Sequence, residues 1–61
     1  MNQLNTSEVL RVLRTERDKC AQHAHEQDSQ GNPVDAQLWR DNIQGINRTI
    51  IAINKLAGYS L

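Results

Sequence analysis

The sequence predicts an all-α protein, an antiparallel hairpin of two helices over about residues 6–29 and 33–57, with the 61-residue chain forming a single domain. Three observations lead to this prediction. Apolar residues recur at every third or fourth position through the second half, and a break containing Gly, Asn and Pro lies near the middle. A chain of this length also buries too little surface to be more than marginally stable alone, which favours self-association.

The segment around Asn5–Glu8 has the sequence features of a helix N-terminus. Asn5 is a favourable N-cap residue, because its side chain can accept a hydrogen bond from the backbone N–H of Glu8. The Glu8 side chain can in turn reach back to the backbone N–H of Asn5. We therefore expect the first helix to begin near Thr6, and no Gly or Pro interrupts it before about Ser29.

The break between the helices has its own sequence signals. Gly31 suits the left-handed conformation that closes a helix, and Asn32 is expected to cap the next one. Pro33 is favourable in a first helical turn, and Asp35 complements the positive end of the helix dipole. A connection of about 2–5 residues between helices predicts that they run antiparallel.

The second helix carries the strongest pattern in the chain. Its apolar positions alternate in steps of three and four, and we call this set the seam: Ala36, Trp39, Ile43, Ile46, Ile50, Ile53 and Ala57. Such a line packs along its whole length against other helices. Gly58 is expected to close the helix. Leu38, Ile51 and Leu56 lie off the seam, so the apolar arc is wider than one neighbouring helix covers.

The first helix offers large apolar side chains only in its first half, around Val9–Leu13. In an antiparallel hairpin these residues lie beside Ile50–Leu56, and Trp39 then faces the small side chains Cys20, Ala21 and Ala24. We therefore predict a homo-oligomer, most simply a four-helix-bundle dimer or a higher assembly of such dimers. The residues predicted to form the self-association surface are Trp39, Ile43, Ile46, Ile50, Ile53, Leu10 and Leu13.

Gly45 interrupts an otherwise strong helix at a cost of about 1 kcal/mol relative to Ala. Together with Ala52, one heptad later, it forms a shallow groove beside the seam. Three interpretations of this groove stay open: neutral sequence drift, close packing of a helix, and a site for a ligand or partner.

The seven basic and seven acidic side chains cancel, so the chain has no overall attraction for nucleic acid or anionic lipid. Arg11, Arg14 and Arg17 make the first helix locally basic, although Arg14 and Asp18 are spaced to form an ion pair. A solvated charged face is the preferred interpretation and a protein partner the next. A small nucleic-acid-binding regulator that uses these arginines is the weaker alternative.

Cys20 and His23 lie three residues apart, with Glu16 one turn earlier, and all three side chains are zinc ligands. One such pair lacks the second pair that makes a metal motif specific, so polar packing at a helix interface is the preferred interpretation. A hairpin also offers no cleft for a Cys–His nucleophile and base. We predict no catalytic residue, no metal and no cofactor, and hence no enzyme.

The single cysteine, the lack of a secretory segment and the short apolar runs favour a cytoplasmic protein with no membrane association. The segments Leu4–Arg11 (LNTSEVLR) and Trp39–Ile43 (WRDNI), within a short helical hairpin, resemble the very small early proteins of lambdoid bacteriophages, encoded between the exonuclease and excisionase genes. This resemblance implies expression in an infected bacterial cytoplasm. It also implies an accessory part in the lysis-versus-lysogeny decision, through contacts with host or phage proteins.

Overall fold

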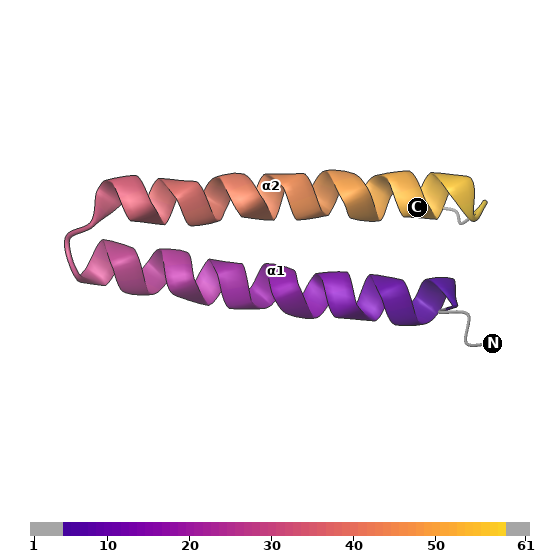
Figure 1. Ribbon diagram of the computed structural model, residues 1–61, viewed down its shortest axis with the longest axis horizontal. Coiled ribbons are helices and arrows are strands. Elements are labelled where there is room, and N and C mark those ends of the chain that lie inside the picture. The colour runs from indigo at the N-terminus through magenta and orange to yellow at the C-terminus, as the bar shows by residue number, and fades with distance from the viewer. Residues whose placement is uncertain (1–4, 59–61) are drawn as a thin grey trace.

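The computed structural model describes residues 5–58, which form two helices of equal length: α1 (Thr6–Ser29) and α2 (Pro33–Leu56). The helices lie side by side and antiparallel, so that α1 begins and α2 ends at the same end of the hairpin (Figure 1). The predicted all-α hairpin is therefore confirmed. The second helix ends one residue earlier than expected, with Ala57 as its C-cap.

The start of α1 follows the predicted capping chemistry. Asn5 has an extended backbone, and its Oδ1 accepts a hydrogen bond of 2.8 Å from the backbone N–H of Glu8. This bond satisfies one of the N–H groups that have no partner within the first turn of a helix.

Gly31 ends α1 in the left-handed conformation, with φ +77°. The N–H of Asn32 donates to the carbonyl of Gln27 at 2.8 Å, and the N–H of Gly31 donates to the carbonyl of Asp28 at 3.1 Å. These two bonds make a Schellman motif, which satisfies the carbonyls of Gln27 and Asp28 near the end of α1. The role predicted for Gly31 is confirmed, and Gly58 takes the same conformation after α2, with φ +74°.

Asn32 departs from its expected role. It occupies the N-cap position of α2, yet its side chain makes no capping bond and its Nδ2 donates to Oε1 of Gln27 at 3.0 Å. Its backbone, at φ −111° and ψ 73°, lies outside the extended region from which an N-cap side chain reaches its own helix. The prediction that the Asn32 side chain caps α2 was therefore wrong.

The core lies between the two helices and is small. Six residues are buried in the described part of the chain: Leu10, Cys20, Ala24, Ala36, Ile50 and Asn54. Three cross-helix contacts fix the register: an ion pair of Asp28 with Arg40, a ring stack of His23 on Trp39, and a hydrogen bond of Arg17 to Asn47. This register places the beginning of α1 beside the end of α2, as the sequence predicted.

The seam faces α1 and is only partly covered by it. Leu10 and Ile50 are buried, whereas the other residues predicted for self-association are half-buried, namely Leu13, Trp39, Ile43, Ile46 and Ile53. Ala21, expected to face Trp39, is exposed instead. The seam therefore joins the two helices of the hairpin, and α1 leaves it partly exposed.

Candidate functional site

Large apolar side chains are exposed on the outside of the hairpin, and they are unevenly distributed. Among the described residues these are Val12 (57% exposed), Val34 (73%), Leu38 (58%), Ile51 (45%) and Leu56 (90%). Four of these five residues lie on α2. The outer surface of α2 is therefore the candidate functional surface of the protein.

One line along α2 gathers two of these side chains with small residues between them. We call it the outer stripe, and its members alternate in steps of four and three: Leu38, Asn42, Gly45, Thr49, Ala52 and Leu56. All six are exposed. Alternation in steps of three and four keeps residues on one face of a helix, so the outer stripe runs beside the seam without overlapping it.

The middle of the outer stripe has open space at Gly45 and a hydroxyl at Thr49 that bonds within its own helix. A Cβ atom added to Gly45 would meet no atom within 4 Å, so nothing in the hairpin requires a glycine there. The Thr49 hydroxyl donates to the backbone carbonyl of Gly45 at 2.9 Å. The threonine hydroxyl therefore needs no acceptor from outside its own helix.

The three arginines predicted as a partner or nucleic-acid face do not share one environment. Arg11 and Arg14 are exposed. Arg17 is half-buried, and its Nη1 donates to Oδ1 of Asn47 on α2 at 3.2 Å. Asp18, expected to pair with Arg14, lies instead with its Oδ1 3.9 Å from Nε of Arg17. Arg17 is thus part of the contact between the helices, which sequence spacing alone did not indicate.

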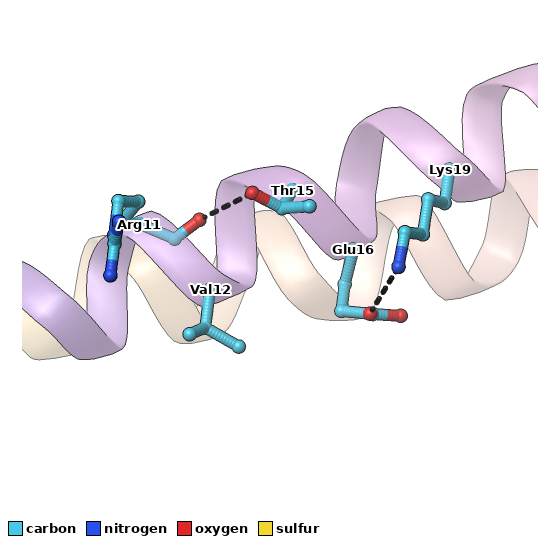
Figure 2. A pocket seen from close by; sticks show the side chains of 5 residues that line it. All are labelled: Arg11, Val12, Thr15, Glu16 and Lys19. Carbon is cyan, nitrogen blue, oxygen red and sulfur yellow. Dashed lines mark hydrogen bonds and ion pairs between the residues drawn. The ribbon is translucent and has the colours of Figure 1, made fainter.

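A shallow surface pocket lies on the outer side of α1. Figure 2 shows its lining, which comes from this one helix: Arg11, Val12, Thr15, Glu16 and Lys19. Lys19 Nζ is 3.6 Å from Oε1 of Glu16, and the Thr15 hydroxyl donates to the carbonyl of Arg11 at 3.0 Å. Its volume of about 280 Å³ is below the range of about 300–1,000 Å³ typical of small-molecule sites. The contacts of Lys19 with Glu16 and of Thr15 with Arg11 show that the polar groups of the pocket pair with one another and do not converge on a ligand.

The residues considered as metal ligands have different roles. Cys20 is buried, whereas Glu16 is exposed and paired with Lys19. The His23 ring stacks on Trp39 with ring centroids 4.5 Å apart and an angle of 24° between the planes. Across residues 5–58, no group of three or more His, Cys, Asp or Glu side chains is placed to hold a metal ion.

The stack of His23 on Trp39 is a contact that sequence reasoning missed. The predicted register placed Trp39 opposite Cys20, Ala21 and Ala24, but the side chain that covers its ring is His23. His23 covers one face of the indole while its Nδ1 stays 3.9 Å from Oε2 of Glu26. A half-exposed histidine thus shields an aromatic ring that small side chains would leave open to water.

Neither described helix combines the length and apolar character needed to cross a membrane. Comparison with known proteins found no matching family model, no similar curated protein and no similar solved structure.

Proposed function

We propose that this protein is a non-enzymatic interaction protein that self-associates through the apolar surface of its hairpin and presents the charged outer side of α1 to a protein partner. The observation that carries the proposal is the exposure of large apolar side chains on α2, above all Leu38, Leu56 and Val34. Such groups gain free energy when they are removed from water, so several large apolar side chains left exposed on one helix favour an interaction surface there.

The shape of the chain supports self-association. Its radius of gyration is 14.0 Å, against about 10.5 Å for a compact domain of the same length. Its accessible surface is 4792 Å², against about 4,000 Å² for a compact protein of its mass. The surplus is comparable to the roughly 800 Å² that each partner contributes to a standard protein interface.

The outer side of α1 suits a different role. It carries exposed charges of both signs, including Arg11, Glu16 and Lys19, and these are compatible with water in the assembled state. A mixed-charge surface favours a protein of complementary charge over the uniformly negative backbone of nucleic acid. Because Arg17 is hydrogen-bonded to Asn47, a nucleic-acid-binding surface made of all three arginines is further disfavoured.

The resemblance to small early proteins of lambdoid phages adds a biological setting to this proposal. In that setting the assembled hairpin acts in the bacterial cytoplasm as an accessory factor that influences the lysis-versus-lysogeny decision through host or phage proteins. The similarity of Leu4–Arg11 and Trp39–Ile43 to those phage proteins is what supports this setting.

Sedimentation equilibrium together with circular dichroism, from low micromolar to submillimolar chain concentration, tests self-association directly. We expect a mass at least twice the chain mass of 6.9 kDa and a helicity that rises with concentration, because only the assembled form buries the apolar surface. A fully helical monomer at every concentration would contradict the proposal.

The choice between a protein partner and nucleic acid needs a second experiment. We expect the assembled protein to show no mobility shift of duplex DNA or RNA at low salt. A salt-dependent shift that weakens in the variants Arg11→Gln and Arg14→Gln would overturn the protein-partner proposal in favour of nucleic-acid binding.

A further inference from the structure

We propose that the outer stripe of α2 is a self-recognition surface, on which the outer stripe of a second copy packs antiparallel about a two-fold axis. This inference rests on the proposed self-association and specifies where and how it occurs. Its consequence is an assembly with the two α2 helices at the centre and the two α1 helices outside.

The order of residues along the outer stripe is the first argument. A two-fold interface is formed by the same patch on both chains, so a residue that contacts a second residue is contacted by it in return. Three pairs in the outer stripe are equally distant from position 47: Leu38 with Leu56, Asn42 with Ala52, and Gly45 with Thr49. Antiparallel alignment about that position brings each residue opposite the other member of its pair.

The distribution of side-chain sizes is the second argument. Gly45 and Thr49 near the axis let two helices approach closely, while Leu38 and Leu56 at the ends supply the apolar area that is buried. The bond from the Thr49 hydroxyl to the carbonyl of Gly45 lets this position be buried without leaving an unpaired polar group. Gly45 lowers the stability of its own helix, and its lack of a side chain is useful only where another helix packs closely against it.

The charges beside the outer stripe are the third argument. Asp41, Arg48 and Lys55 follow one flank at intervals of seven residues, and all three are exposed. The same antiparallel alignment places Asp41 near the partner's Lys55, and symmetry repeats this attractive pair. Arg48 comes near its own copy at the rim of the contact, where exposed like charges cost little because water screens them.

The variant Gly45→Gln tests the surface. In the isolated hairpin the new side chain meets open space and Gln has a higher helix propensity than Gly, so helicity is expected to be maintained or to rise. In the proposed dimer the same side chain separates the two helices, and we expect the dimer dissociation constant to rise about tenfold or more. The matched control is Ala21→Gln, which places the same side chain at an exposed position of α1 and should leave the constant unchanged.

Cysteine cross-linking tests the orientation. Two chains are prepared on a Cys20→Ala background, one with Gly45→Cys and one with Thr49→Cys, and they are mixed and oxidised. Disulfides require Cα atoms within about 7 Å, so an antiparallel contact favours the mixed disulfide between positions 45 and 49. Predominance of the disulfides that join identical positions would indicate a parallel contact and would overturn the inference.

These experiments separate the inference from the proposal beneath it. A wild-type chain that stays monomeric removes both. A wild-type dimer whose dissociation constant is unchanged by Gly45→Gln keeps the proposed function and overturns the assignment of the outer stripe, since self-association must then use another surface.

Discussion

The two helices have the same length and pack against each other along one line, yet their outer surfaces differ. The outer side of α1 carries charged side chains that pair within their own helix, such as Lys19 with Glu16, and Val12 is its exposed large apolar residue within the described part. The outer side of α2 carries four such apolar residues over the same length. The sides of α1 and α2 that face each other hold the hairpin together. Their outer sides differ because one is mainly charged and the other exposes large apolar side chains.

This difference gives each helix a separate role. Water satisfies the exposed charges of α1, so this helix can stay on the outside of any assembly. It does not satisfy the exposed leucines of α2, which gain free energy by packing against another apolar surface. In the proposed assembly, α2 therefore faces its copy and α1 faces other partners.

The largest effect is expected from placing a charge on the inner side of α2. Ile50→Asp puts a carboxylate at a position that is 8% exposed, and the cost of several kcal/mol exceeds what a core this small can offset. We expect the helical signal in circular dichroism to be lost.

The neighbouring variant Ile51→Asp is the matched control, because the same carboxylate at a position 45% exposed stays in contact with water. It should keep the helical signal. Retention of helicity by Ile50→Asp would mean that the seam is not the surface that joins the two helices.

The next effect compares the outer sides of the helices at equal exposure. Leu38 and Val12 are 58% and 57% exposed, so removing either one by substitution with Gln changes the isolated hairpin to a similar degree. We expect Leu38→Gln to raise the dimer dissociation constant about tenfold, because the symmetric dimer loses two buried leucines, and Val12→Gln to leave it nearly unchanged. Sedimentation equilibrium of both variants measures this, and equal effects would remove the distinction between α1 and α2.

Most features of the fold that depend on neighbours in sequence were predictable, and the side-chain cap by Asn32 was the exception. The cap by Asn5 and the left-handed closure at Gly31 each involve residues within one turn, and both are present as expected. The antiparallel register also followed, since a short connection leaves the two helices little freedom to slide. Local chemistry and the period of the apolar residues were therefore sufficient for the architecture.

The individual side-chain contacts between the two helices were not predictable. Arg17 was grouped with Arg11 and Arg14 by spacing on α1, but Asn47 on α2 draws it into the contact between the helices. His23 was considered as a metal ligand, but it lies on Trp39. In both cases the deciding atom belongs to a residue distant in sequence, and helical periodicity does not say which side chain will reach across. The outer stripe was partly predictable, because the sequence placed Leu38 and Leu56 off the seam, and the structure shows that both are exposed.

The smallest expected effect compares the two helix starts. Asn5 accepts the backbone N–H of Glu8, whereas Asn32 makes no capping bond and contacts Gln27 at an exposed position. We expect Asn5→Ala to lower the free energy of unfolding by about 1 kcal/mol and Asn32→Ala by about 0.3 kcal/mol, because only the first leaves a helix N–H without its partner. Urea unfolding at one fixed chain concentration measures both, since the proposed self-association would make the stability depend on concentration. A larger loss for Asn32→Ala would show that this side chain turns to cap α2 in solution, which would give both helices the same kind of start.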